Sequence, residues 1–271
     1  MTKLIKPNIK KVVNSYINDI KEKNIGIAFS GGIDSLSLVF SSMECNKNIN
    51  LYSFTLEDHI STDFLEARKF AELYKLNFTP IFLPKNELTL KKDLLFLSKL
   101  GAKKKVDFTC GYPMLYIFRN LKEKTLVSGL GADGHYCISK KGMIHFKDRI
   151  QEFRDNLFSN PNYAQKILNE NIAKYYKKTT VIPYLAKEMI DEFRGTTWVE
   201  LNKPRQKNAT LMNYQEYFKE IKVRNHVNLQ LGDSKIESNL YQLLEGNWNI
   251  RNYKSITGIF NSINRGEVWV K

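Results

Sequence analysis

One stretch constrains this chain more than any other: an apolar segment, two glycines and a second apolar segment in immediate succession, at residues 25–35. Residues 25–29 are mostly apolar and predict a short strand, whereas residues 33–40 carry apolar side chains at helical spacing. Gly31 and Gly32 lie at the turn between them, where they permit backbone conformations that other residues avoid. Such a turn brings N–H groups to the positive end of a helix, so it predicts a phosphate or pyrophosphate site.

The polar side chains of this turn fit the same site. Ser30 and Ser35 are predicted to donate hydroxyl groups to phosphate oxygens, and Asp34 is predicted to bind Mg²⁺ beside the anion. The structural alternative is a Gly-Gly turn with an incidental aspartate. We favour the functional interpretation, because the motif and its strand-to-helix position agree.

A second glycine-rich turn follows the short apolar segment 125–127. Its sequence over 128–134 is Ser-Gly-Leu-Gly-Ala-Asp-Gly, with Asp133 as its acid. Because the carboxyl ends of neighbouring parallel strands face one crevice, we expect Asp133 and Asp34 to be the metal-binding carboxylates of one site. The alternative is a surface turn with a solvated aspartate.

The order of apolar patterns indicates the fold class. Strands and helices alternate from residue 25 to residue 83, which predicts an α/β protein with a doubly wound parallel sheet. Phe54 and Thr55 end the predicted strand 50–55 and are expected to border the adenine. Further helices are predicted over 86–100, with Asn86 as N-cap, and over 112–121.

Beyond about residue 150 the pattern is helical. We predict helices over 149–158, 163–176 and 185–193 without intervening strands, and another near 236–244. The predicted organisation is a phosphate-binding α/β domain over 1–148, to which the family resemblance described below assigns ATP, and a mostly helical region over 149–271 that completes the substrate site.

Composition narrows the classes of partner and compartment. The net charge is +14, but the lysines are dispersed and the densest run is 103–105, so a nucleic-acid partner is the less favoured alternative. The three cysteines form no CxxC pair, which argues against a zinc site or a disulfide framework. Without a signal-peptide core or an apolar run of about 20 residues, we expect a cytoplasmic protein with no membrane partner.

Both turns carry a family resemblance. Residues 30–35 match the SGGxDS signature of the PP-loop ATP pyrophosphatases, and residues 128–134 resemble the SGxGxDE segment in the synthetase domain of asparagine synthetase and β-lactam synthetase. The resemblance implies an adenine nucleotide alpha hydrolase-like fold that uses ATP and Mg²⁺. It also implies an AMP- and pyrophosphate-forming ligase or amidotransferase, which adenylates a small-molecule carboxylate for attack by ammonia or an amine.

The resemblance also assigns residues. Lys207, with Lys203 and Arg205 behind it, corresponds to the lysine that the family keeps over the α-phosphate, and Asp133 is the second candidate catalytic residue. The residues carried over to nucleotide binding are Ser30, Gly31, Gly32, Asp34, Ser35, Gly129 and Gly131. A solvated basic loop is the alternative for Lys207.

The chain departs from the family pattern in two places. Gly134 and His135 follow the acidic turn where the family has glutamate, and Asp107 is the only acid near the basic run 103–105, where the family has an acid that acts on the nucleophile. His135 could serve as a base, but we favour a surface or capping role.

The nitrogen source is a separate expectation. Thr2 stands where the family's glutaminase domain has its cysteine, and the phosphate loop begins at Ser30, so we expect no such domain. The nucleophile is then free ammonia, ammonia from a separate donor or glutaminase, or an amine of the substrate.

Two other functions remain open at this point. One is a PP-loop enzyme that modifies a nucleobase in tRNA or DNA, which the positive charge supports. The other is a nucleotide-binding protein without catalysis, which the missing acids support.

Overall fold

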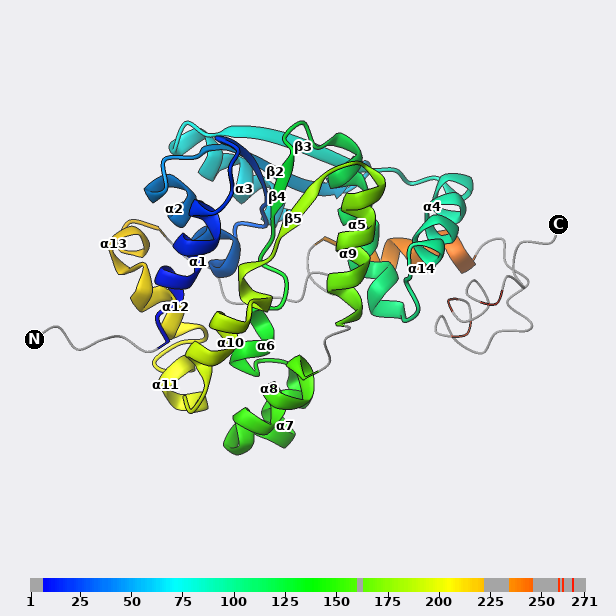
Figure 1. Cartoon of the computed structure of the whole chain (residues 1–271). Helices are drawn as coiled ribbons and strands as arrows, with labels where there is room; N and C mark the ends of the chain where they lie inside the picture. The colour runs from blue at the N-terminus through cyan, green and yellow to red at the C-terminus, as the bar shows by residue number, and fades with distance from the viewer. Residues whose placement is uncertain are drawn as a thin grey trace, which may run out of the picture. The chain divides into compact units, whose positions relative to one another are not determined.

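Five parallel strands form one sheet in the order β3-β2-β1-β4-β5 (Figure 1). The computed structural model describes residues 7–159, 163–221 and 234–245, with residues 258, 260 and 265. The strands are β1 (Asn24–Ala28), β2 (Asn48–Leu56), β3 (Asn77–Leu83), β4 (Thr125–Val127) and β5 (Thr179–Val181). The expected α/β fold with a doubly wound parallel sheet is confirmed.

The strand order places the topological switch point between β1 and β4. Gly26 pairs with Leu126 and Ile27 with Val127, in parallel register. Chain segments leave these two strands in opposite directions along the sheet, and ligands of such sheets bind where the order reverses. Both glycine-rich turns follow the strands at this point.

Helices flank the sheet (Figure 1). The first half of the chain contributes α1 (Ile9–Asn18), α2 (Ile33–Glu44), α3 (Thr62–Leu73), α4 (Glu87–Lys99) and α5 (Lys105–Asn120). The second half contributes α6 (Ala132–Tyr136), α7 (Lys140–Phe146), α8 (Ile150–Phe158), α9 (Ala164–Tyr175), α10 (Lys187–Phe193), α11 (Trp198–Asn202), α12 (Asn208–Asn213), α13 (Gln215–Phe218) and α14 (Ile236–Glu245). Among the described helices, none is long and apolar enough to cross a membrane.

Within the described ranges, two short 3₁₀ turns also occur, at Lys147–Arg149 and Pro183–Leu185. The cap predicted for α4 is confirmed, since the Asn86 side chain accepts a hydrogen bond from the Thr89 N–H at 2.9 Å.

The prediction that the second half has no strand is wrong. Residues 179–181 form β5, and the Ser128 N–H donates to the Val181 carbonyl at 3.0 Å. A Thr-Thr-Val triplet suits an extended chain because all three side chains are β-branched. Three residues are too few to show a period, so the helical patterns on both sides hid the strand.

The start predicted for α5 at Tyr112 is also wrong, because the helix begins at Lys105. Pro113 lies inside it, although proline in a helix interior costs about 3 kcal/mol. Two features offset that cost. Asp107 caps the first turn, and Phe108, Leu115 and other buried side chains pack along the helix.

The chain divides into two compact units. Unit 1 comprises residues 1–51, 123–163 and 180–226, and unit 2 comprises residues 52–122, 164–179 and 227–271. Both glycine-rich turns and Lys207 belong to unit 1, whereas Phe54 and Thr55 belong to unit 2. The domain boundary expected at residue 148 stays a prediction.

Within unit 2, α5 packs closely on α9. A Cβ atom on Gly111 would lie 2.8 Å from Leu168 Cδ2, so only glycine permits this approach without movement. Phe260 is buried and stacks on Phe108, with ring centroids 4.7 Å apart. Three other aromatic residues of the C-terminal part, Trp248, Tyr253 and Trp269, lie outside the described residues.

Candidate active site

The turn after β1 is held by its own polar atoms. Gly31 has φ +72°, the left-handed region that favours glycine, and Gly32 precedes the first turn of α2. The Ser35 hydroxyl donates to the Gly32 carbonyl at 3.0 Å, and the Gly32 N–H donates to the Ser30 hydroxyl at 3.3 Å. The two hydroxyl oxygens lie 3.3 Å apart. The serines predicted to bind phosphate therefore also fix the turn that would bind it.

The turn after β4 lies directly against the first one. A Cβ atom on Gly129 would lie 3.5 Å from Asp34 Cβ. Gly131 has φ +89° and begins α6, and a Cβ atom there would lie 2.2 Å from Leu185 Cδ2. Gly131 thus lets the second turn approach the segment around Leu185, whereas the Gly129 position leaves room for a Cβ atom beside Asp34.

Lys207 joins the two turns. Its ammonium Nζ lies 2.5 Å from Asp34 Oδ2 and also forms an ion pair with Asp133 Oδ1. The Lys207 side chain is 4% exposed, whereas the Asp34 and Asp133 side chains are 17% and 52% exposed. Three residues predicted from distant parts of the sequence therefore meet at one point.

The charge of Lys207 is stable at neutral pH. Burial acts to lower its pKa, but Asp34 and Asp133 raise it by more, so the pKa of the ammonium lies above the ordinary value for lysine. A cation is thereby held at the switch point of the sheet, between the two glycine-rich turns.

Comparison with known proteins decides the family. The family model of asparagine synthase matches residues 20–236, which is most of the chain. The chain belongs to the asparagine synthase family. It is therefore a member of the PP-loop class of ATP-utilising proteins, for which ATP is the nucleotide.

Several solved structures are similar to this family member at low identity. The U34-tRNA thiolase NcsA from Methanococcus maripaludis, with its 4Fe–4S cluster, is 17% identical, with a TM-score of 0.39 over 96% of this chain and 76% of that chain. NMN synthetase from Francisella tularensis is 12% identical, with a TM-score of 0.38 over 82% and 98%.

A predicted subunit of tRNA methyltransferase from Methanocaldococcus jannaschii is also 12% identical, with a TM-score of 0.33 over 68% of this chain and 94% of that chain. Among curated protein sequences, none matches this chain significantly.

Asn202 supports Lys207 and could not be identified from the sequence. Lys207 has φ +60°, an unusual conformation for a residue with a side chain, and its N–H donates to Asn202 Oδ1 at 3.1 Å. The Asn202 amide in turn donates to the Tyr136 carbonyl at 3.0 Å, on the same short helix as Asp133. Asn202 thus links the backbone of Lys207 to the helix that carries Asp133, and no motif marks it.

A second missed feature is a pair of buried hydroxyl contacts on α2. The Tyr184 and Ser37 hydroxyl oxygens lie 2.8 Å apart, and those of Tyr214 and Ser41 lie 2.6 Å apart. Ser37 also donates to the Asp34 carbonyl at 2.7 Å. The C-terminal segment of unit 1 is thereby fixed to the helix that begins with the phosphate turn.

His135 is neither a surface nor a capping residue, so that expectation is wrong. It is fully buried, and its ring stacks on Phe158 and Phe193 with centroids 4.5 Å and 4.3 Å away. Burial lowers its pKa to about 3, although the hydrogen bond of Nε2 to the Tyr184 carbonyl acts in the opposite direction. A neutral, enclosed imidazole fits a structural role in the core better than a base.

Other predicted residues lie apart from this cluster. Lys203 and Arg205 are exposed. Thr55 of unit 2 donates to the His59 carbonyl and accepts from the Ser61 N–H, and neighbouring Phe54 is half-buried on β2. Their contact with adenine stays a prediction.

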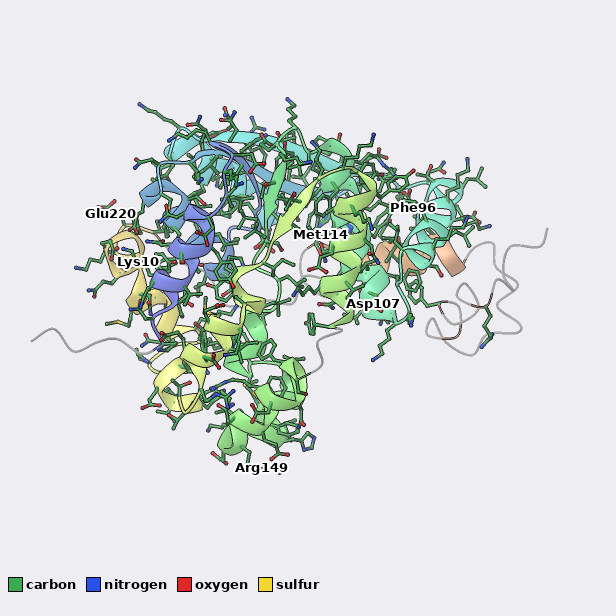
Figure 2. All side chains as sticks on the ribbon, viewed as in Figure 1. Lys10, Phe96, Asp107, Met114, Arg149 and Glu220 are labelled. Carbon is green, nitrogen blue, oxygen red and sulfur yellow. The ribbon has the colours of Figure 1, made fainter. Side chains whose placement is uncertain are left out.

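Asp107 of unit 2 is a capping residue. The side chain is buried, and Oδ2 accepts hydrogen bonds from the N–H groups of Lys103 and Lys104 at 3.0 Å and 2.9 Å (Figure 2). This use accounts for the acid at the start of α5 without a catalytic role.

The two carboxylates fit a magnesium ion in their chemistry. Asp34 and Asp133 each direct an oxygen at the same point, where Lys207 Nζ now lies, and Mg²⁺ prefers one or two carboxylates together with phosphates and water. Within the described part of the chain, no group of three or more histidine, cysteine or acidic side chains could hold a metal. Cys137 is buried and Cys45 and Cys110 are half-buried, and none of the three forms a disulfide.

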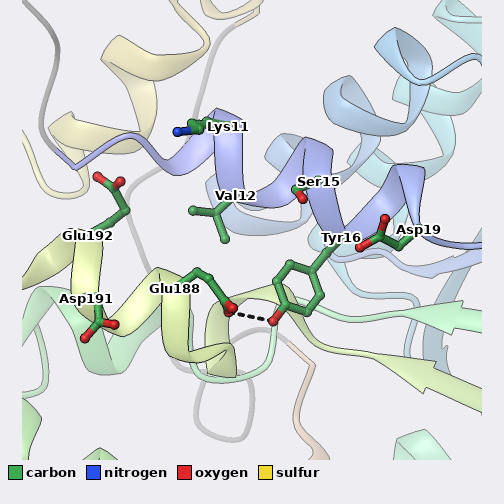
Figure 3. Close-up of a pocket in the computed structure, with 8 residues that line it drawn as sticks. All are labelled: Lys11, Val12, Ser15, Tyr16, Asp19, Glu188, Asp191 and Glu192. Carbon is green, nitrogen blue, oxygen red and sulfur yellow. Dashed lines mark hydrogen bonds between the residues drawn. The ribbon is translucent and has the colours of Figure 1, made fainter.

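A cavity of about 580 Å³ also lies in unit 1, but it shares no residue with the two turns (Figure 3). Residues of α1 and α10 line it, and several are acidic. These acidic side chains have partners nearby. Glu188 accepts a hydrogen bond from the Tyr16 hydroxyl at 2.7 Å, Asp191 forms an ion pair with Lys187, and Glu192 accepts from the Asn8 N–H. The cavity is a packing feature beside α1.

Proposed function

We propose that this protein is an ATP-dependent, amide-forming ligase or amidotransferase that adenylates a small-molecule carboxylate and releases pyrophosphate and AMP. One observation carries the proposal: the buried Lys207 ammonium bridges Asp34 and Asp133 at the turns after β1 and β4. A fixed cation between two N–H-rich turns suits the binding and cleavage of a polyphosphate chain.

Each residue has a distinct task in this proposal. The turn from Ser30 to Ser35 binds the β- and γ-phosphates through its N–H groups, and Gly129 and Gly131 let the second turn approach the nucleotide. Lys207 stabilises negative charge that develops on the α-phosphate. Asp34 and Asp133 would hold Mg²⁺, which when bound neutralises phosphate charge.

The proposed reaction has two steps, adenylation of the carboxylate and displacement of AMP by the amine. A substrate carboxylate oxygen attacks the α-phosphorus, the bond to the β-phosphate breaks, and pyrophosphate leaves. An amine then attacks the acyl carbon, the bond to the AMP oxygen breaks, and AMP leaves with the carboxylate's former oxygen. The proton that the amine loses passes to solvent water, because the enclosed His135 and the capping Asp107 are unsuited to accept it.

The donor of nitrogen follows from the same chemistry. Free ammonia, ammonia from a separate glutaminase, or an amine of the acceptor would each satisfy the second step. We place the reaction in the cytoplasm, where ATP is available and the thiols of the three cysteines stay reduced.

The direct test is ATP–pyrophosphate exchange against a panel of small carboxylates. We expect exchange that requires one carboxylate, falls at least about a hundredfold in Lys207→Met, and is lost in Asp34→Asn. Asp191→Asn is the matched control, since Asp191 also pairs with a lysine in unit 1 but lies on α10. If no nucleotide binds at residues 30–35 when Mg-ATP is saturating, the proposal is refuted.

The second candidate is modification of a nucleobase in tRNA or DNA, which the net charge of +14 favours. It predicts that nucleic acid co-purifies with the protein and is removed by salt, and that exchange requires nucleic acid rather than a carboxylate. Pyrophosphate release with any acceptor would exclude a protein that only binds nucleotide.

A further inference from the structure

The Lys207 ammonium occupies the position between two carboxylates where a metal ion would bind. Nζ contacts Oδ2 of Asp34 and Oδ1 of Asp133 at the same time. These carboxylates are the ones that the proposed function gives to Mg²⁺. A metal ion and the ammonium cannot share the position, since both are cations and Mg²⁺ requires oxygen ligands at about 2.0–2.1 Å.

The backbone of Lys207 does not need to move for the ammonium to leave. Its N–H is fixed to Asn202 Oδ1, and it directly precedes α12, in which Ala209 and Thr210 are buried. The side chain is a flexible four-carbon stem that can carry the charge to another anion within reach. The phosphates of a nucleotide would provide that anion.

We infer that Lys207 acts as the resident counter-ion of the carboxylate pair and suppresses metal binding until nucleotide is present. The inference rests on the proposed function only in assigning Asp34 and Asp133 to the metal. When a polyphosphate enters, the ammonium moves from the carboxylates to the phosphates, and the carboxylates accept the metal. Metal and nucleotide then bind together, although the protein alone binds the metal weakly.

The test titrates wild-type protein with Mn²⁺ in the absence of nucleotide. The EPR signal of the free hexaaqua ion measures how much Mn²⁺ remains unbound. We expect Lys207→Met to bind one Mn²⁺ at least about tenfold more tightly than the wild type, because a buried positive charge beside the site is removed. The added substitution Asp34→Asn should abolish that gain.

The chain offers a matched control for the loss of one positive charge. Lys10 on α1 also bridges two carboxylates of unit 1, with Nζ 2.6 Å from Glu44 Oε1 and 2.5 Å from Glu216 Oε1. This pair is more exposed, and solvent screens it. Lys10→Met should therefore leave Mn²⁺ affinity near the wild-type value.

Two results would overturn the inference. One is wild-type protein that binds Mn²⁺ without nucleotide as tightly as Lys207→Met does. The other is a folded Lys207→Met or Lys207→Gln protein with no gain in affinity. If neither variant folds, the wild type still provides a test. Tight Mn²⁺ binding by the wild type without nucleotide, abolished by Asp34→Asn, overturns the inference. Because no ATP or acceptor is added, failure of the exchange assay leaves this result unaffected.

Discussion

At the scale of single residues, Lys207 combines a buried charge with a left-handed backbone. A residue with a side chain pays about 1–3 kcal/mol for such a conformation, so the surrounding contacts must determine it. Asn202 supplies the main one, since its amide holds both the Lys207 N–H and the Tyr136 carbonyl. The position of the cation thus depends on a residue with no charge.

The first prediction concerns Asn202→Ala. Losing buried hydrogen bonds should lower the free energy of unfolding by about 2 kcal/mol, and the freed Lys207 should weaken binding of a non-hydrolysable Mg-ATP analogue about tenfold. Urea unfolding and calorimetric titration measure the two effects.

Asn213→Ala is its matched control. Asn213 Nδ2 donates to the Pro7 and Ala209 carbonyls, and Oδ1 accepts from the Lys10 N–H. Asn202 has the same pattern of three bonds, because its amide also donates to the Trp198 carbonyl. It should cost stability without changing affinity for the analogue. Equal affinity of Asn202→Ala and wild type would show that Asn202 only stabilises the fold.

The second prediction concerns pH. The pKa of His135 is about 3 in the folded protein and 6.5 in the unfolded chain, so the unfolded state binds more protons below pH 6.5. Stability from this residue is therefore present above pH 6.5 and is lost as pH falls towards 3. Between pH 7 and pH 5 the loss is about 2 kcal/mol.

Urea unfolding at the two pH values checks this. His135→Phe keeps an aromatic ring between Phe158 and Phe193, and it should reduce the change in unfolding free energy between pH 7 and pH 5 by about 2 kcal/mol. Substituting the exposed His145 by phenylalanine is the control. An unchanged pH dependence in His135→Phe would mean that the imidazole is charged in the folded protein.

At the scale of secondary structure, the sequence patterns were strongest where an element is long or bounded by a cap. The predicted bounds of α4 and α8 differ from the observed ones by a single residue, because apolar spacing and caps such as Asn86 mark them. β5 and the first turns of α5 escaped prediction. In both segments the local sequence pattern is weak, and contacts with residues distant in sequence determine the secondary structure.

The third prediction separates capping from catalysis at α5. Asp107→Ala should lower the free energy of unfolding by about 1–2 kcal/mol, because the N–H groups of Lys103 and Lys104 lose their acceptor. Affinity for the Mg-ATP analogue should not change. Asn86→Ala on α4, which removes a more exposed cap, should cost about 1 kcal/mol in the same urea titration. A stable Asp107→Ala protein that exchanges pyrophosphate but forms no amide would instead make Asp107 catalytic.

At the scale of the whole molecule, the candidate site draws on segments at residues 30–35, 129–133 and 207. Sequence alone predicted the two turns, because each combines glycines with an acid after an apolar strand. Lys207 was found only through the family resemblance, since a single lysine among 42 basic residues carries no pattern. Asn202, Tyr184 and Tyr214 could not be found, because their roles exist only once the chain is folded.

The fourth prediction follows from this dispersed origin. A non-hydrolysable Mg-ATP analogue at about 100 times its dissociation constant should raise the free energy of unfolding by about 2.7 kcal/mol. Hydrogen exchange should slow in all three segments together, and Asp34→Asn should show neither effect. Protection confined to residues 30–35 would contradict a shared site.

The order of these segments along the chain also matters during translation. Asp34 and Asp133 leave the ribosome before Lys207 does, and synthesis of the intervening residues takes roughly several seconds. During that interval the nascent protein carries both acidic turns without the lysine that neutralises them. The cation that completes the pair in the finished protein is the last part of the cluster to be made.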